Sequence, residues 1–589
     1  MTSCMSTGCG WFTPSRVAGE IAYNIGTGTN FLIREKWNKL DFYIGDNNHT
    51  KGEDWYYAVL AYGPDGWSQE SDPNNTTKFS PNRSPFNGTQ NPGLYPYQEV
   101  IWGYAAHPPT VGQQLWSPQR IPWVPRGIFG TQWPGNWQPA RETPRPTFYY
   151  LPDIKANYNG WNSYIVIQNT HNDLTLAVDI ALYNQDGTFN KWWLDPPVPP
   201  ATQPPPYIRL APRASRTIAV ADRFSGSSFN GSAVIAASQD VAVVVENQAS
   251  SSSYAYNGIT AGGYGDPTFE RTGTTLYAPT MYGNQWGWDS TVGVMNTGSA
   301  TANVQIQFKG RSGYGDTTRT YNISPNGQLE VVASSVMGSN WVGSLVIQST
   351  NGQPLAAIVH EHHTSQATRA YNASSAGSST LYVPAAYKNQ WGMTTGLVVQ
   401  NVGSGPTTAY LYFYDRDGNY IASVSLLDID AGRAQGLWLG DTSAVPDGWT
   451  GWVKVGSSNG QPLAVYVNTV RPEGHYAYTG ASTPGNTAIL PWAAKNASGR
   501  TTGYTVLNTS SSSVQVTATY YDTSGWARAS QVYSLPAKGV KGRYQGDDTF
   551  LPDPWQGSIV LQAGAGGPLM AMMREDSSST TSAYNGVAR

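Results

Sequence analysis

Short stretches in which apolar and polar residues alternate recur through most of the chain. In ANVQIQFKG (302–310), Val304, Ile306 and Phe308 alternate with polar residues and would share one face of a strand. Turn signals such as DRDG (415–418) follow such stretches at the hairpin position. About seven short strands in each ~105 residues, without helical periodicity, are typical of an immunoglobulin-like sandwich. The pattern therefore predicts an all-β fold.

The strand pattern repeats four times in the C-terminal part of the chain. Each repeat has a proline followed 17 residues later by an asparagine, in the pairs Pro152/Asn169, Pro279/Asn296, Pro384/Asn401 and Pro491/Asn508. Each repeat closes on Ala-Tyr-Asn or a variant, with the tyrosines Tyr256, Tyr371, Tyr478 and Tyr584. We therefore predict four tandem β-sandwich repeats, repeat 1 (147–273, with a Pro-rich insertion at 195–206), repeat 2 (274–379), repeat 3 (380–486) and repeat 4 (487–589). We expect each to have its own core, and the four to stand in a row in which each contacts mainly its neighbours.

Residues 1–146, here called the aromatic head, differ from the repeats. They hold nine of the 22 tryptophans and most of a proline-dense tract at 107–147, where regular strand pairing is disfavoured because proline donates no ladder hydrogen bond. So much aromatic surface needs a partner, either the repeats of the same chain or a neighbouring subunit. The tryptophans that we assign to an interface or a glycan site are Trp37, Trp55, Trp102, Trp116, Trp123, Trp133 and Trp137.

Composition narrows the class of protein. Charged residues make up 12% of the chain, about half the usual share, and the formal net charge is −3. No basic field therefore favours nucleic acid as a partner. No apolar run approaches the ~18 residues of a membrane span, and the first residues show no basic stretch followed by an apolar run, the form of an export signal. A polar, weakly charged, aromatic-rich β-protein is typical of the cell exterior, so we expect an extracellular or cell-surface location.

Three of the seven histidines lie beside a glutamate at residues 360–363. On a strand, His360 and His362 would share one face while Glu361 and His363 point to the other. Two histidines at this spacing can chelate a metal ion, but a catalytic zinc normally has a third protein ligand. Alignment of the repeats puts Asn468 opposite His360, so the histidines are not part of the repeated scaffold. We interpret the cluster as a solvated strand end, with a metal site at His360 and His362 as the weaker alternative.

The segment YDRDGNY (414–420) resembles the start of a calcium-binding loop. Asp415, Asp417 and Asn419 stand at alternate positions, as in such loops, but the downstream bidentate glutamate is missing. Asp-Gly is also a favoured hairpin turn pair. We therefore predict a plain turn and no cofactor, with calcium as the alternative.

Three tyrosines follow one another on the predicted solvent face of a strand in repeat 3. Tyr410, Tyr412 and Tyr414 form an aromatic stripe that either stacks on glycan or packs against protein, and packing is the commoner outcome.

Acidic residues also crowd the aromatic head beside tryptophans, as in sugar clefts. They are Glu20, Glu35, Asp41, Asp46, Glu53 and Asp54. No nucleophile elbow, phosphate-binding loop or zinc-protease motif accompanies them. We predict that the chain is not an enzyme, with a secreted glycoside hydrolase as the least favoured alternative.

The repeated Gln-Asn-x-Gly strand end, Asp-x-Asp-Gly hairpin and Gly-Gln-Pro-Leu-Ala turn give residues 149–589 a resemblance to a known class of modules. They resemble the tandem immunoglobulin-like modules of prokaryotic cell surfaces, which include secreted surface-layer, stalk and filament subunits. The resemblance implies the sandwich architecture and a surface location. It brings no catalytic residue, because one such architecture serves many functions.

These observations favour an extracellular structural protein, a subunit of a self-assembling filament, sheath or surface layer whose partners are copies of itself. A contact between two different surfaces builds an open filament whenever its rotation does not close. The aromatic head differs from the repeats, which predicts head-to-tail polymerisation through residues 1–146. The alternative is a carbohydrate-binding surface adhesin that uses the head tryptophans and the tyrosine stripe.

Overall fold

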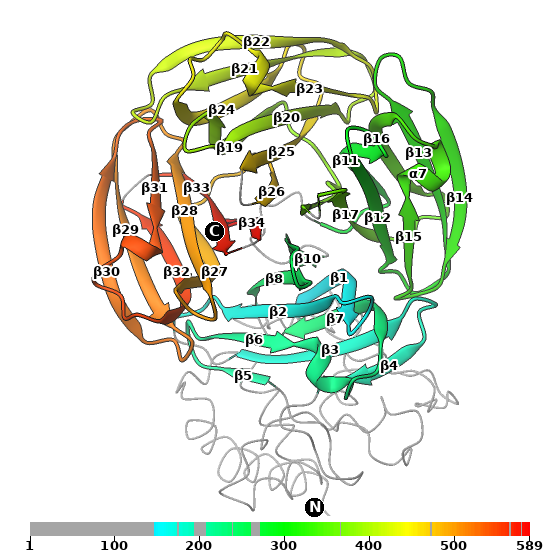
Figure 1. Ribbon diagram of the computed structural model, residues 1–589, viewed down its shortest axis with the longest axis horizontal. Coiled ribbons are helices and arrows are strands. Elements are labelled where there is room, and N and C mark those ends of the chain that lie inside the picture. The colour runs from blue at the N-terminus through cyan, green and yellow to red at the C-terminus, as the bar shows by residue number, and fades with distance from the viewer. Residues whose placement is uncertain are drawn as a thin grey trace, which may run out of the picture. The chain divides into compact units, whose positions relative to one another are not determined.

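A computed structural model shows the fold of the repeats (Figure 1). The structure describes residues 147–172, 176–193, 208–237, 240–260, 271–365, 367–471, 474–564, 567–578 and 580–588. The chain divides into two compact units, the first comprising Met1–Pro146, Asn172–Val178 and Leu194–Arg209, and the second Thr147–His171, Asp179–Trp193 and Leu210–Arg589. The second unit holds almost all described residues. The aromatic head lies outside them.

The strands of the first two repeats are as follows. Repeat 1 has β1 (Thr147–Ala156), β2 (Asn162–Asn169), β3 (Leu176–Asn184), β4 (Phe189–Trp192), β5 (Ile208–Leu210), β6 (Ser215–Ala219), the 3-10 helix η5 (Val220–Arg223), β7 (Phe229–Ala237), β8 (Val241–Gln248), β9 (Ser253–Asn257) and β10 (Ile259–Thr260). Repeat 2 has β11 (Thr275–Gly283), β12 (Trp288–Asn296), β13 (Ala302–Gly310), β14 (Thr317–Ile323), β15 (Gln328–Val332), the short helix α7 (Ala333–Met337), β16 (Trp341–Ser349), β17 (Leu355–His363) and β18 (Thr368–Asn372).

The other two repeats follow the same order. Repeat 3 has β19 (Thr380–Lys388), β20 (Thr394–Asn401), β21 (Thr407–Tyr414), β22 (Tyr420–Ile429), β23 (Ala434–Trp438), η6 (Leu439–Asp441), β24 (Trp449–Ser457), β25 (Leu463–Arg471) and β26 (Gly474–Thr479). Repeat 4 has β27 (Thr487–Lys495), β28 (Arg500–Asn508), β29 (Val514–Asp522), β30 (Ala527–Leu535), β31 (Val540–Tyr544), η7 (Gln545–Asp547), β32 (Trp555–Ala563), β33 (Leu569–Ser577), β34 (Thr581–Asn585) and β35 (Val587–Ala588). The predicted all-β fold is confirmed.

Each repeat consists of two antiparallel sheets. In repeat 2 one sheet has the order β11-β16-β13-β14 and the other the order β15-β12-β17-β18. Repeats 3 and 4 have the same two orders, and repeat 4 adds β35 beside β27. The side chains of β13 alternate between buried and more exposed positions, as the sequence pattern predicts for a strand with one face on a core.

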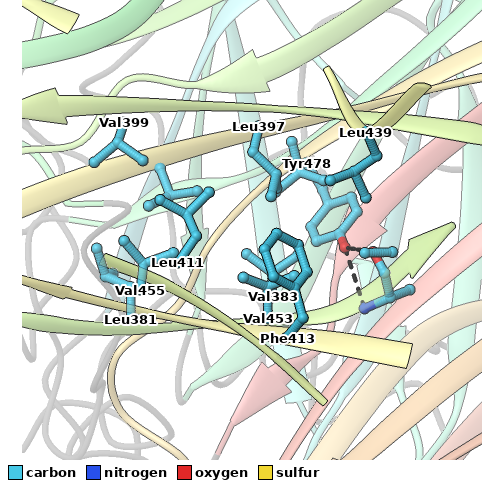
Figure 2. Close-up of a cluster of buried hydrophobic side chains, with 14 of the residues drawn as sticks. Leu381, Val383, Leu397, Val399, Leu411, Phe413, Leu439, Val453, Val455 and Tyr478 are labelled. Carbon is cyan, nitrogen blue, oxygen red and sulfur yellow. Dashed lines mark hydrogen bonds between the residues drawn. The ribbon is translucent and has the colours of Figure 1, made fainter. Parts of the chain in front are cut away.

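The repeated proline marks a bulge in the first strand of each repeat. The register between this strand and its partner shifts at Leu151/Ile154, Ala278/Met281, Val383/Ala386 and Leu490/Ala493, the positions that flank the four prolines. Proline lacks the N–H that a ladder needs, so a bulge is where a strand accommodates it. In repeat 3 the closing Tyr478 fastens this bulge, because its Oη donates to the Ala385 carbonyl at 2.6 Å and accepts from the Ala385 N–H at 3.3 Å (Figure 2). The corresponding pairs are Tyr256–Asp153, Tyr371–Thr280 and Tyr584–Trp492.

The repeated asparagine fixes the loop that follows the second strand. Asn401 is buried, and its Nδ2 donates to the carbonyls of Gly405 and Ile429, both at 2.7 Å. Asn169, Asn296 and Asn508 likewise donate to two backbone carbonyls each. The constant distance between proline and asparagine therefore reflects two successive strands, one in each sheet of the repeat, with a buried hydrogen-bonded feature on each strand.

The core of a repeat lies between its two sheets. In repeat 3, Leu381, Val383, Leu397, Leu411 and Phe413 belong to one buried cluster (Figure 2). The same cluster includes Met572 and Ala583 of repeat 4. The cluster of repeat 2 likewise includes residues of repeat 3, and that of repeat 4 includes residues of repeat 1. Repeats 2, 3 and 4 therefore each have a buried cluster between their own sheets, and each of these clusters also takes in a few apolar side chains of a neighbouring repeat.

The four repeats close on themselves instead of standing in a row. Within the second unit their sheets surround a common centre (Figure 1), where the strands that carry the closing motif, β9, β18, β26 and β34, contact one another in turn and β34 contacts β9. Asn257 links three repeats there, since its N–H donates to Asn372 Oδ1 at 3.2 Å and its Nδ2 to the Asn585 carbonyl at 2.9 Å. Asn585 Nδ2 in turn donates to Thr479 Oγ1 at 2.7 Å. The closing Ala-Tyr-Asn motif therefore joins the repeats into a ring.

Candidate functional site

The surfaces between successive repeats, called seams 1–2, 2–3, 3–4 and 4–1, collect most of the buried charged groups. One set of seam contacts uses the repeated Gly-Ser positions. Ser232 Oγ donates to the Asn326 carbonyl at 2.7 Å, and Ser344 Oγ donates to the Gly432 carbonyl at 2.8 Å, each across a seam. At seam 4–1, Gln168 Nε2 donates to Ser558 Oγ at 2.6 Å. The other contacts involve side chains that differ from repeat to repeat.

Seam 1–2 contains the first two histidines of the cluster. Tyr254 of repeat 1 stacks on His360, with ring centroids 5.3 Å apart and an interplanar angle of 3°. His360 Nδ1 and His362 Nε2 are 2.7 Å apart, which confirms that the two share a face of the strand, and Trp161 meets His362 edge-on. His360 is buried, so the interpretation of the cluster as a solvated strand end is wrong. The reason is that the tip of β17 faces repeat 1 and not solvent.

Charged groups of repeat 1 face these histidines. Lys155 forms an ion pair with Asp153 and lies 3.7 Å from Glu330, while Tyr254 Oη donates to Asp153 at 2.7 Å. Burial opposes ionisation of Asp153, but Lys155, His360 and the hydrogen bond from Tyr254 together outweigh it and hold the pKa of Asp153 below its usual value. Burial, together with His362 and Lys155, lowers the pKa of His360 well below the ordinary histidine value. Burial and Lys155 also lower the pKa of His362. At neutral pH this seam therefore contains a neutral histidine pair beside a buried ion pair.

Seam 2–3 is built around Arg369, whose guanidinium forms a fully buried ion pair with Glu361. Burial disfavours its charge, but Glu361 raises the pKa of Arg369 above its usual value. The guanidinium also lies over the Trp288 ring, 3.8 Å from its centroid. From repeat 3, Tyr466 Oη donates to Glu361 at 2.7 Å, and the ring of His475 meets Trp288 at 5.2 Å.

Seams 3–4 and 4–1 carry further ion pairs. At seam 3–4, Arg471 of repeat 3 lies 2.6 Å from Asp576 of repeat 4. At seam 4–1, Arg500 of repeat 4 pairs both with Glu575 of its own repeat and with Glu246 of repeat 1. Burial, and then the proximity of Glu246, raises the pKa of Glu575 well above its usual value. The ring is therefore closed by an arginine between two carboxylates.

The seams use corresponding positions of the repeats with different chemistry. The strands β8, β17, β25 and β33 occupy the same place in the four repeats. Their register puts four different residues at one equivalent position, Glu246, His360, Asn468 and Arg574. The described residues include no group of three or more His, Cys, Asp or Glu arranged to hold a metal ion. The weaker alternative of a metal site at His360 and His362 thus gains no third ligand from the described residues. The arrangement is suited to holding four different repeats in one order.

The candidate calcium residues lie in the turn between β21 and β22. Asp415 Oδ1 accepts from the N–H groups of Asp417 at 3.0 Å and Asn419 at 2.8 Å, and Oδ2 accepts from Asn419 Nδ2 at 2.9 Å. Asp186 and Asp522 accept backbone N–H groups in the corresponding turns of repeats 1 and 4. The Asp415 carboxylate therefore has a structural role in shaping the hairpin.

The tyrosine stripe divides into two parts. Tyr414 stacks on Trp452 with ring centroids 4.2 Å apart and an interplanar angle of 7°, next to buried residues of repeat 4. Tyr410 and Tyr412 lie 6.1 Å apart and are partly exposed, and Lys454 lies 5.9 Å above the Tyr412 ring. All three tyrosines are partly exposed, but one face of the Tyr414 ring is occupied by Trp452.

Two exposed tryptophans were not singled out from the sequence. Trp286 and Trp391 stand at the tips of the turns that join β11 to β12 and β19 to β20, and about two thirds of each side chain is exposed. The signal was in the sequence, because the repeated Asn-Gln-Trp-Gly places tryptophan inside a turn. The tryptophans that we had assigned to an interface or glycan site in the aromatic head, Trp37, Trp55, Trp102, Trp116, Trp123, Trp133 and Trp137, lie outside the described residues, as do the acidic residues there.

The fold and the seams define an all-β protein made of tandem sandwich repeats. Over residues 280–540 the chain is similar to a protein family described as a family of unknown function (DUF5719). This span covers most of repeat 2, all of repeat 3 and half of repeat 4, and so includes the residues named above for seam 2–3 but not Asp576 of seam 3–4. No curated protein matches the chain. The described residues contain no helix with the length and apolar character of a membrane span.

Proposed function

We propose that this protein is an extracellular structural subunit that assembles with copies of itself into a filament, sheath or surface layer. The observation that carries the proposal is the outer rim of the ring. β14, β22 and β30 each end a sheet, and they lie at the outside of the ring in Figure 1. Within the described residues, each pairs with a neighbouring strand on one side only.

Two of these edge strands have surfaces suited to pairing with another chain. Leu427 on β22 is 58% exposed and Val532 on β30 is 62% exposed. β22 has one charged residue, Asp428, and β30 has one, Arg528. Natural edge strands are usually protected by lysine, proline or inward charges, because an exposed apolar edge recruits further strands. Neither strand contains lysine or proline.

The aromatic head supplies the complementary half of the contact in this proposal. Its sequence is rich in tryptophan, so burying it against a neighbour removes a large apolar area from water. A strand from one copy that adds to an edge of the next gains main-chain hydrogen bonds and apolar burial together. Because the head and the rim are different surfaces, the contact extends head to tail.

Sedimentation velocity of the full-length chain over a range of concentrations tests the proposal. We expect large polymers for the wild type and a shift to small species when Leu427 and Val532 are both replaced by lysine. Asn303→Lys is the matched control, because Asn303 is exposed on β13, a strand with partners on both sides. A wild type that stays monomeric at all concentrations would overturn the proposal. Equal loss of assembly in the control would show that added charge, and not the edge, is responsible.

A further inference from the structure

Trp286 and Trp391 occupy the same place in two successive repeats. Each is the first of two loop residues in a hairpin whose second loop residue is glycine. In repeat 2 the hairpin is closed by Gln285 and Trp288, whose N–H groups donate to each other's carbonyls at 2.9 Å. Trp286 is 64% exposed and Trp391 65%. We propose that the two indoles are stacking platforms that bind a neutral polysaccharide built from pyranose rings.

The backbone conformation of the two turns is unfavourable for tryptophan. Both have φ = +52°, in the left-handed region that bulky side chains rarely adopt. A two-residue turn of this kind favours Asn-Gly, and repeat 1 has Asn159-Gly160 there, while repeat 4 has Ser498-Gly499. The scaffold therefore forms without tryptophan. A residue that opposes its local conformation and keeps about two thirds of its surface exposed points to a role in binding.

The packing around each indole holds it while leaving most of its surface accessible. The Trp286 ring approaches Tyr282 at 6.1 Å with an interplanar angle of 62°. Trp391 approaches Tyr387 at 6.3 Å and 58°, so the geometry repeats. Because the tyrosines support the indoles without covering them, both tryptophans present a restrained apolar surface to solvent.

The neighbouring groups are polar and mostly neutral. A Cβ atom on Gly287 would lie 3.0 Å from Thr364 Oγ1 and 2.6 Å from His363 Nε2, so a hydroxyl and an imidazole adjoin the turn of Trp286. Asn284 and Asn389 are exposed at the start of the two turns. A pyranose ring has an apolar C–H face that stacks on an indole, while its hydroxyls bond to such amides and hydroxyls. Among the described residues, the two tips carry no cluster of cations that would favour an acidic sugar.

The size of each platform also favours a sugar over a protein. A tryptophan offers about 150–250 Å² of surface in total, whereas a stable protein interface buries about 800 Å² on each partner. One indole therefore matches one sugar ring. Two equivalent platforms on one rigid ring suit a repeating polymer, because the second binding event becomes intramolecular and raises the overall affinity. A polysaccharide should consequently bind better than its short oligosaccharides.

Affinity electrophoresis of the full-length chain tests this site. The gels contain hydroxyethylcellulose, soluble xylan, glycol chitin or dextran, and we expect at least one polysaccharide to retard the protein. Trp286→Asn and Trp391→Asn should each weaken binding about tenfold and the double variant about a hundredfold. The asparagine copies repeat 1, so the melting temperature should stay the same or rise by about 1–2 °C.

Trp526→Asn is the matched control. Trp526 is also highly exposed, but its turn uses its backbone, since its N–H donates to Asp522 Oδ1 and its carbonyl accepts from the Asp522 N–H, both at 3.0 Å, and Asn419 fills the same place in repeat 3. The control should bind as the wild type does. Absence of retardation by all four polysaccharides, or retardation unchanged in the double variant, would overturn the proposal. So would a melting temperature lowered by several degrees in the double variant, since the indoles would then be structural, or binding to phosphatidylcholine vesicles alone.

This inference does not depend on polymerisation. A monomeric ring would present the same two indoles, and the variants should leave the sedimentation profile unchanged. Failure of glycan binding and failure of self-assembly are therefore distinguished by separate measurements.

Discussion

Replacing Arg500 with methionine should weaken the closure of the ring more than any other single change at seam 4–1. Only 14% of the Arg500 side chain is exposed, and only 8% of each of the side chains of Glu246 and Glu575, so the three charges are largely removed from water. Without the arginine, two carboxylates remain buried side by side. Removing one partner of a buried ion pair costs about 3–5 kcal/mol. Because the three side chains are slightly exposed, we expect Arg500→Met to lower the free energy of unfolding by about 3 kcal/mol, the lower end of this range.

The sequence itself offers a neutral replacement for the whole cluster. In repeat 3 the positions that correspond to Arg500 and Glu575 hold Met393 and Thr469, and Asn468 corresponds to Glu246. The triple variant with methionine, threonine and asparagine removes all three charges together. We expect it to recover most of the lost stability, to within about 1–1.5 kcal/mol of the wild type, because no unpaired charge stays buried.

The assay is guanidinium denaturation of the full-length chain, followed by tryptophan fluorescence and circular dichroism. Burial beside Glu246 raises the pKa of Glu575, so the folded chain binds more protons than the unfolded chain above the ordinary glutamate value of about 4.3. Stability of the Arg500→Met variant should therefore fall as the pH rises from about 5.5 to 7.5, and its deficit should be largest at the higher pH. A deficit below about 1 kcal/mol, or a triple variant no more stable than the single one, would refute the reasoning.

Three further predictions concern single side chains of the ring. Burial lowers the pKa of His475 to about 4, so the unfolded chain binds more protons than the folded chain between about pH 6.5 and 4, and stability falls as the pH drops through that window. His475→Thr should flatten this pH dependence in thermal unfolding. An unchanged slope would contradict the assignment. Tyr371→Phe removes the hydroxyl that donates to the Thr280 carbonyl at 2.5 Å and should cost about 1–3 kcal/mol in denaturant unfolding; a neutral effect would show that the bulge does not need it. Asn401→Ala leaves the buried Ile429 carbonyl without its donor and should cost about 2–3 kcal/mol, measured in the same way, whereas a cost below 0.5 kcal/mol (on the order of ordinary surface substitutions) would contradict its structural role.

Local features of the repeats could be predicted from the sequence because they arise from short-range chemistry. The alternation in 302–310 gave β13 and its buried face. The constant spacing of Pro384 and Asn401 reflects a bulge in β19 and a capped loop after β20, two strands that follow each other directly in the chain. The turn at Asp415 could likewise be predicted from the Asp-Gly pair at 417–418.

Ring closure and the seams could not be predicted in this way, because they pair residues that are far apart in the chain. Asn257 and Asn585 are joined across the closure of the ring, and nothing in either repeat alone indicates the other. The histidines were misread for a related reason. His360 is absent from the other repeats, which suggested a free strand end, yet positions that vary between repeats are where each seam has its own chemistry. A strand tip whose residues differ between repeats can therefore lie against a neighbouring repeat as readily as in solvent.

Cryo-electron microscopy of the assembled full-length protein tests the central claim most directly. The account predicts polymers in which each subunit keeps a closed ring of four repeats and meets the next copy at the outer edge strands β22 or β30. Monodisperse particles at every concentration, or polymers whose contacts leave these edges free, would contradict it.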